Sequence, residues 1–454
     1  MNLESVRWGT AVPYKDGIGP ADSLQSVAAT MAPDCCLVRA STGVAILLLL
    51  LLLSLDASAL MDTVHHRPWD ATVVAIDIGN TNSCVAGYAD GRAQTMFQLC
   101  IPSWVAFTGN GTLLVGDDAR NHAAVNPGSA IFGFKRLLGK RWNHWYDTDV
   151  VQRLIKTVPY KLVEKNSNPH IQVKLNGGAA KEYGAEQITA MIIAKLREAA
   201  EAYIGRDVRY AIFTVPQHYN QAPTESTRYA GQIAGVRATR MLDEPIAAAV
   251  AYGLHQKLRE EGNVLVLHVG GGTAEASVLT LVDGVFQFYS ARHDLFLGGD
   301  DFDQRIVDHF VALIKQKHGK DISNDKEAHG KLRAACEQAK KVLSTRRHAQ
   351  LAIESLVDGL DFMETLTRAK FEELNHDLFL KVIALLDRVM VEAELEKKRN
   401  MVDEILLIGG STMIPKIQRL VRDYFDGKVV NASLKPDEVV TLGAALLTHP
   451  SADG

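Results

Sequence analysis

Two segments of the chain repeat one pattern of apolar and polar positions. In each, an apolar run with the length and branching of a buried strand leads into a glycine-containing turn, and a second apolar run follows. The segments are 73–88 (VVAIDIGNTNSCVAGY) and 264–281 (VLVLHVGGGTAEASVLTL). An Asp-Gly pair, typical of a tight hairpin turn, comes shortly after each second run, at 90–91 and 283–284. The pattern predicts two related β-hairpins far apart in the chain.

Further strands and helices follow from the pattern elsewhere. A third glycine turn, at 405–411 (ILLIGGS), connects an apolar strand to a helix that Pro415 begins. Residues 186–203 place apolar side chains on one face, which is typical of an amphipathic helix. The other predicted elements are a strand at 209–215 that Pro216 ends and helices at 243–254, 331–344 and 436–448. The presence of three glycine turns of this kind in one chain favours a common function for them over a chance occurrence.

Length and composition are those of an ordinary globular protein. A chain of 454 residues is long enough for two or more hydrophobic cores, and 47% of the residues are hydrophobic. The formal net charge is −4, so the chain has no excess of basic residues that would indicate a nucleic-acid partner. Beyond the N-terminal segment the cysteines are Cys84, Cys100 and Cys336. An odd number without metal-ligand spacing predicts neither a disulfide framework nor a zinc site.

The N-terminal segment has the pattern of a secretory signal peptide. Arg39 precedes an apolar run at 43–55, and the small residues at 57–59 fit a cleavage site. The run of 13 residues is shorter than the roughly 20 that a membrane-spanning helix needs. A start at Met31 would give a signal of ordinary length. We therefore assign 1–60 to an N-terminal extension and signal peptide, with an uncleaved signal anchor as the alternative.

The glycine turns have the chemistry of a phosphate site. Three glycines at 270–272 leave backbone N–H groups unobstructed, and Thr273 adds a hydroxyl group. A glycine-rich hairpin without a ligand fits this segment alone equally well. The first hairpin carries Asp77, a carboxylate able to hold a hydrated metal ion, whereas the second has His268 at the corresponding place. Two such hairpins suggest two related half-domains that close on one nucleotide.

Other candidate residues each have two interpretations. Lys135, in the basic stretch 134–140, could reach a phosphate or could lie on a solvated helix face. Glu244 stands at a helix start, where a carboxylate is often only a capping charge. The predicted helix at 331–344 has a polar face that fits an ion-paired surface or a wall against a purine and ribose, and its members are Glu337, Lys340, Lys341 and Ser344. Asn110 and Asn431 begin glycosylation sequons, which matter only if the chain enters the secretory route.

In their order along the chain, these motifs resemble the seventy-kilodalton heat-shock chaperones (the heat shock protein 70 family), and most closely the luminal binding protein (BiP) branch. The likeness covers about 71–448. It rests on DIG at 77–79, PSWVAF at 102–107, KRL at 135–137, TVP at 214–216, DEP at 243–245, GGGT at 270–273, LGG at 297–299, FD at 302–303 and GGST at 409–412. The resemblance implies an α/β protein with the actin-like ATPase fold, which is built from duplicated domains similar to ribonuclease H. Two lobes of two subdomains, 71–257 and 258–448, would surround a nucleotide cleft.

The resemblance also implies roles for individual residues. Catalysis would fall on Asp77, Lys135, Glu244, Thr273, Glu275 and the degenerate position His268. Nucleotide binding would fall on Gly79, Asn80, Thr81, Gly270, Gly271, Gly272, Glu337, Lys340, Lys341, Ser344, Gly409, Gly410, Ser411 and Asp437. The implied cofactors are ATP or ADP and Mg²⁺, with K⁺ as a candidate further ion. Asp77 would hold Mg²⁺ through water, and Lys135 with Glu244 would position the γ-phosphate.

Several positions depart from the family pattern. The family has aspartate where this chain has His268 and Glu275, Thr-Thr-Tyr where it has 80–82 (NTN), and arginine where it has Met413. Mg²⁺ prefers oxygen ligands, and a neutral imidazole brings no negative charge to its water shell. Losing a group that positions the attacking water or the metal costs about 10²–10⁴ in rate. We therefore expect nucleotide binding with weakened ATP hydrolysis.

The resemblance implies the endoplasmic reticulum lumen or secretory pathway and a role in protein folding or chaperone regulation. The implied partners are co-chaperones of the J-domain or nucleotide-exchange type, without a stable membrane span. Because the sequence ends at Gly454, we expect no peptide-binding domain, no direct peptide clamp and no Lys-Asp-Glu-Leu retention signal. One alternative is a non-hydrolysing, nucleotide-sensing interaction module, which ATP binding without hydrolysis would indicate. Another is a sugar kinase of the same superfamily, which phosphorylation of an added sugar would indicate.

Overall fold

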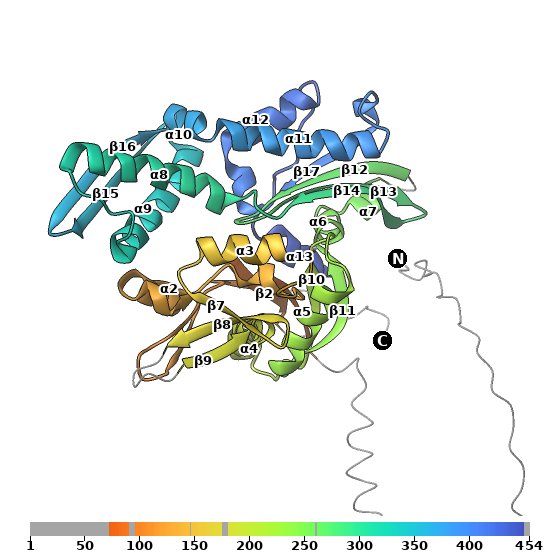
Figure 1. Ribbon diagram of the computed structural model, residues 1–454. Helices are drawn as coiled ribbons and strands as arrows, with labels where there is room; N and C mark the ends of the chain where they lie inside the picture. The colour runs from red at the N-terminus through yellow and green to blue at the C-terminus, as the bar shows by residue number, and fades with distance from the viewer. Residues whose placement is uncertain (1–71, 90–95, 146, 175–179, 259–260, 449–454) are drawn as a thin grey trace, which may run out of the picture. The chain divides into compact units, whose positions relative to one another are not determined.

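The computed structural model describes residues 72–89, 96–145, 147–174, 180–258 and 261–448, which belong to one unit of the chain (Figure 1). The predicted extension and signal peptide at 1–60 and the Asp-Gly pair at 90–91 lie outside these residues. Within the described ranges, no helix combines the length and the apolar character that crossing a membrane requires.

The first predicted hairpin is confirmed and forms the centre of a five-stranded sheet. Its strands are β1 (Val73–Ile78) and β2 (Asn82–Tyr88), joined by β3 (Met96–Pro102), β10 (Tyr210–Val215) and β11 (Arg237–Asp243) in the order β11-β10-β1-β2-β3. β10 and β11 run parallel to β1, whereas β2 and β3 continue it as an antiparallel meander. Parallel neighbours need a crossover connection, and the predicted amphipathic helix, α4 (Ala185–Ile204), lies in that connection.

The second predicted hairpin is also confirmed, in a four-stranded sheet of the same plan. Its strands are β12 (Glu261–Val269), β13 (Ala274–Val282), β14 (Val285–Asp294) and β17 (Glu404–Ile408), in the order β14-β13-β12-β17. β17 is parallel to β12, as β10 is to β1. Asp283 and Gly284 both have positive φ, +50° and +77°, which is the backbone of the type I′ turn that an Asp-Gly pair predicts. The protein is thus mixed α/β, with one strand arrangement used twice.

Two short helices pack closely on each other between these sheets. They are α6 (Glu244–Ala251) and α13 (Val439–Leu446), and Figure 1 shows them between β10 and β12. A Cβ atom on Gly443 would lie 1.8 Å from the Ala247 carbonyl oxygen, so only glycine permits this crossing. One cluster of buried side chains includes both helices and strands of both sheets. The predicted helix at 243–254 ends earlier because Gly253 has the left-handed φ of +65°, and α7 (Leu254–Lys257) follows.

Three smaller sheets, β5-β4-β6, β7-β8-β9 and β15-β16, and further helices make up the rest of the described chain. Predicted helices are confirmed in α9 (Lys326–Thr345) and α12 (Pro415–Tyr424). The others are β4 (Val105–Phe107), β5 (Leu113–Val115), α2 (Asp117–Val125), η2 (Pro127–Ser129), β6 (Ala130–Ile131), η3 (Phe134–Leu137), α3 (Thr148–Thr157), β7 (Lys161–Lys165), β8 (Asn168–Lys174), β9 (Ala180–Gly184), α5 (Gln221–Ile233), α8 (Gly299–His318), β15 (His348–Val357), β16 (Leu360–Thr367), α10 (Arg368–Leu374), α11 (His376–Glu392), η4 (Arg399–Met401) and η5 (Gly410–Met413).

A disulfide bond corrects the cysteine prediction. Cys84 in β2 and Cys100 in β3 stand directly opposite each other in the antiparallel ladder, with Cα atoms 4.1 Å apart and sulfur atoms bonded. The expectation of no disulfide was wrong because the pairing depends on strand register, which a count of cysteines does not contain. Cys336 is a buried free thiol in α9.

Candidate nucleotide-binding site

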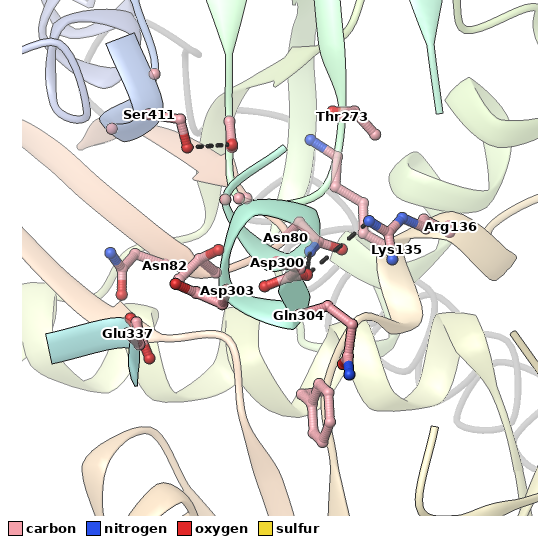
Figure 2. A pocket seen from close by; sticks show the side chains of 18 of the residues that line it. Asn80, Asn82, Lys135, Arg136, Thr273, Asp300, Asp303, Gln304, Glu337 and Ser411 are labelled. Atoms are coloured by element: carbon pink, nitrogen blue, oxygen red, sulfur yellow. Dashed lines mark hydrogen bonds and ion pairs between the residues drawn. The ribbon is translucent and has the colours of Figure 1, made fainter. Parts of the chain in front are cut away.

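The predicted site residues gather around one cavity of about 1320 Å³. Both hairpin turns, the polar face of α9 and the third glycine turn contribute to its wall. The lining includes Asp77, Gly79, Asn80, Thr81, Lys135, Glu244, His268, Gly270, Gly271, Thr273, Glu337, Lys340, Lys341, Ser344, Gly409, Gly410, Ser411 and Asp437. Figure 2 shows Lys135 and Thr273 at the right of the pocket and Glu337 at the left. Gly272 and Glu275 do not line it.

The two hairpin turns touch each other, and glycine makes this approach possible. A Cβ atom on Gly271 would lie 1.7 Å from the Thr81 hydroxyl oxygen of the first turn. Within the second turn, the Gly270 N–H donates to the Thr273 carbonyl oxygen at 2.9 Å. Gly272 does not line the cavity, and its carbonyl oxygen accepts a 2.6 Å hydrogen bond from Arg136. The glycine run therefore joins two distant segments as well as leaving N–H groups unobstructed.

Lys135 is paired inside the cavity and does not lie on a solvated helix face. It projects from η3, and its Nζ atom lies 3.1 Å from Glu244 Oε1. Only 14% of the Lys135 side chain and 4% of the Glu244 side chain are exposed. Burial opposes the charged form of Lys135, but the charge of Glu244 outweighs it and raises the lysine pKa. Both groups are therefore charged near neutral pH.

Glu244 also holds His268. His268 Nδ1 lies 3.0 Å from Glu244 Oε2, so the two carboxylate oxygens have different cationic or donor partners. Burial alone would raise the pKa of Glu244, but Lys135 and the hydrogen bond from His268 lower it well below its usual range. Burial likewise opposes a charged His268, yet its hydrogen bond to Glu244 raises the histidine pKa. Glu244 is thus more than a capping charge of α6.

Asp77 stands at the end of β1, where the parallel pairing with β10 brings it opposite Thr214. The Thr214 hydroxyl donates a 2.7 Å hydrogen bond to Asp77 Oδ1. Burial and the nearby negative charge of Glu244 raise the pKa of Asp77. A cation at this position would favour the ionised carboxylate, because opposite charge stabilises it.

Sequence reasoning missed a histidine pair beside Glu275. His218 Nδ1 lies 2.9 Å from Glu275 Oε2, and its ring stacks on His293 at a centroid distance of 4.5 Å. Both histidines line the cavity, whereas Glu275 is buried behind them in β13. Because an ionised carboxylate only accepts hydrogen bonds, Glu275 orients the imidazole of His218 through its Nδ1–H. No local spacing links residues so far apart in sequence, so only strand packing reveals the pair.

The polar face of α9 has features of both interpretations, an ion-paired surface and a wall of a ligand site. Lys341 pairs with Glu337 at 2.6 Å, as an ion-paired helix surface predicts. Lys340 is only 11% exposed, donates to the Gly299 carbonyl oxygen at 3.0 Å and lies 2.7 Å from Asp303 Oδ2. Burial nevertheless raises the pKa of Asp303 to about 6. The face lines the cavity, so it can contact a ligand while remaining ion-paired.

The lining offers few groups for a metal ion but several for a polar ligand. In the part of the chain that the structure describes, no group of three or more His, Cys, Asp or Glu residues is arranged to hold a metal. Two buried oxygens, Asn80 Oδ1 and Asp303 Oδ1, have no hydrogen-bond partner among the described residues. Ser411 donates to the Gly270 carbonyl oxygen at 2.8 Å, which ties the third glycine turn to the second hairpin. The lining residues therefore fit a phosphate-bearing molecule whose own oxygen atoms would coordinate a metal ion.

Comparison with known proteins agrees with this geometry. The Hsp70 protein family matches residues 73–450. Heat shock 70 kDa protein BIP3 of Oryza sativa subsp. japonica is 45% identical over 379 residues, which is 83% of this chain and 56% of that protein. The chain therefore spans little more than half the length of this curated relative. The chain belongs to the Hsp70 protein family.

Proposed function

We propose that the cavity binds ATP and ADP and that the protein hydrolyses ATP slowly. The observation that carries this proposal is the meeting of both predicted phosphate turns, the Lys135–Glu244 pair and the polar face of α9 around one cavity. Family membership supports ATP binding and an ATPase activity. It also supports the actin-like fold with lobes at 71–257 and 258–448, and the repeated strand arrangement agrees with this duplication.

The proposed roles divide along the cavity. The backbone of the two turns, with Thr81 and Thr273, would hold the phosphates, and Lys135 would contact the γ-phosphate. The adenosine end would lie against Glu337, Lys340, Lys341, Ser344, Gly409, Gly410, Ser411 and Asp437. Mg²⁺ would offset phosphate charge, with most of its ligands supplied by phosphates and water and with Asp77 outside the water shell. Positioning and charge stabilisation carry phosphoryl transfer without a covalent intermediate.

Slow hydrolysis follows from the partners of Glu244. Lys135 and His268 lie 3.1 and 3.0 Å from its two oxygens, so water on a metal ion would share each oxygen with a partner that is already bound. An aspartate at this position would attract the hydrated cation. The neutral imidazole of His268 adds no such attraction, and a protonated imidazole repels the cation. The same observation favours a second candidate function, a nucleotide-sensing interaction module that binds ATP without turnover.

We propose that the protein works in the lumen of the endoplasmic reticulum, with co-chaperones of the J-domain or nucleotide-exchange type as partners. The Cys84–Cys100 disulfide supports an oxidising compartment, because disulfides persist in the secretory route and are rare in the cytosol. Similarity to a BIP3 protein supports the same location. A contribution to protein folding or chaperone regulation is part of this proposal.

A single-turnover ATP assay on residues 61–454, with ADP affinity measured alongside, tests the function. Slow hydrolysis that Lys135→Ala abolishes would support an ATPase. Tight ADP binding without hydrolysis would instead favour the interaction module. Failure of ATP and ADP to bind the folded protein would refute both functions. Lys195→Ala is the matched control, because Lys195 lies on α4, pairs with Glu198 at the surface and does not line the cavity.

A further inference from the structure

An exposed β-hairpin carries one of the two glycosylation sequons. β4 and β5 pair antiparallel, with Phe107 opposite Leu113, and the loop between them contains Asn110-Gly111-Thr112. Asn110 and Thr112 are both exposed. Gly111 has φ +87°, a left-handed conformation that glycine adopts without strain. The acceptor asparagine is thus presented on a tight turn at the surface.

The hydrogen bonds of this turn hold the sequon in one arrangement. Asn110 Oδ1 accepts from the Thr112 N–H at 3.1 Å and from the Thr112 hydroxyl at 2.9 Å. The Thr108 hydroxyl also donates to this oxygen. All these bonds use the oxygen of the side-chain amide. Among the described residues no hydrogen bond engages Asn110 Nδ2, the atom to which a glycan is joined, so a substituent there displaces no hydrogen bond.

The second sequon has a different environment. Asn431 is only partly exposed, and its backbone is bound to β17 on both sides. Its N–H donates to the Ile405 carbonyl oxygen at 2.7 Å, and its carbonyl oxygen accepts from the Leu407 N–H at 3.3 Å. β17 is the last strand in the order of the second sheet, and Asn431 forms a parallel bridge to it at Leu406, between the fully buried Ile405 and Leu407. Folding of this segment competes with access of a modifying enzyme, whereas the hairpin sequon stays accessible.

We propose that Asn110 is a site of N-linked glycosylation and that Asn431 remains unmodified. The donor is an oligosaccharide linked to a lipid pyrophosphate. Asn110 Nδ2 forms a bond to the anomeric carbon of the first sugar, the bond from that carbon to the pyrophosphate oxygen breaks, and the amide loses one proton. The products are the glycosylated protein and the free lipid pyrophosphate.

The inference depends on the proposed secretory location but concerns a separate surface. None of the residues from 105 to 115 lines the nucleotide cavity. A glycan on the hairpin therefore leaves the cavity wall unchanged. The bulky, solubilising sugar would cover the exposed edge of β5, where the Leu113 side chain is 43% exposed. We expect nucleotide affinity to be the same with and without it.

The experiment expresses the full chain in eukaryotic cells with a reporter sequon fused to its C-terminus. Gel mobility is compared before and after peptide N-glycosidase treatment, and peptide mass spectrometry locates the Asn→Asp conversions that the enzyme leaves. We expect two glycans, one on the reporter and one on Asn110. Asn110→Gln and Thr112→Ala should each remove one glycan, whereas Thr112→Ser should keep it because serine preserves the sequon. Asn431→Gln and Ser433→Ala are the matched controls and should change nothing.

Three results would overturn the inference, and they are distinguishable. A modified reporter with an unmodified Asn110 would show that the chain enters the secretory route but that the hairpin is not an acceptor. Conversion at Asn431 would show that the folded environment does not select between the sequons. A reporter and Asn110 that both stay unmodified would refute the secretory location together with this site, while leaving the ATP-binding proposal to its own assay.

Discussion

At the scale of single residues, His268 distinguishes this cavity from one suited to fast hydrolysis. Its ring lies 3.0 Å from Glu244 and is only 21% exposed. Burial of an imidazole is costly when it is charged, and pairing with a carboxylate offsets this cost. The same pairing engages one of the two Glu244 carboxylate oxygens. A favourable local interaction thus opposes the chemistry proposed for the site.

We predict that His268→Asp raises the single-turnover rate of ATP hydrolysis at least about tenfold. A carboxylate here can attract the hydrated metal and free Glu244 Oε2, and positioned groups of this kind contribute about 10²–10⁴ in rate. The control is His268→Asn, which removes the imidazole without adding charge. Equal rates for both variants and the unmodified protein would mean that another position limits the reaction.

The His268–Glu244 pair also makes stability depend on pH. The folded-state pKa of His268 lies above its unfolded value of about 6.5, because its bond to Glu244 outweighs burial. The stabilisation is therefore complete below that unfolded value and is lost as the pH rises through the folded pKa. We expect the difference in unfolding free energy between the unmodified protein and His268→Gln to shrink from acidic to alkaline pH. Denaturant titrations at several pH values measure it, and parallel curves would contradict the prediction.

At the scale of helices and strands, the elements that the sequence predicted are those that depend on local patterns of residues. Apolar runs with Asp-Gly turns predicted the hairpins, and periodicity predicted α4 and α9, because each depends on neighbouring residues. The Cys84–Cys100 bond and the His218–Glu275 contact were missed, since both depend on how separate strands lie side by side. The residues that resemblance assigned to the site do meet at one cavity, but their roles remain predictions.

The contact between the two hairpin turns gives an element-scale prediction. Gly271→Ala would place a Cβ atom 1.7 Å from the Thr81 hydroxyl oxygen and 3.0 Å from Thr81 Cβ, so the Thr81 side chain or the turns themselves must move. We expect this variant to lose ADP affinity at least about tenfold, or about 1.4 kcal/mol. Gly128→Ala in η2 is the control, because its Cβ would meet no atom within 4 Å and Gly128 does not line the cavity. ADP affinity should be unchanged in this control. Calorimetric titration measures affinity, and unaffected ADP binding in Gly271→Ala would count against a phosphate role for the turns.

At the scale of the whole described unit, the cavity is built by segments that only tertiary structure brings together. The first turn belongs to one sheet and the second turn to the other, and Ser411 connects the third turn to the second. A ligand that contacts all three stabilises their arrangement as well as each turn. At a concentration of 100 times its dissociation constant, ADP should raise the unfolding free energy by about 2.7 kcal/mol.

Hydrogen exchange can show which parts of the cavity a ligand orders. We predict that ADP with Mg²⁺ slows amide exchange in both phosphate turns, 79–82 and 270–273, and in the third turn at 409–411. Adenosine lacks phosphates, so it should protect only the third turn and the adjoining face of α9. Protection of a single hairpin turn by ADP would mean that the two halves do not bind the phosphates together. Equal protection by adenosine and ADP would mean that the glycine turns serve the packing of the two hairpins, and that phosphate recognition lies elsewhere in the cavity.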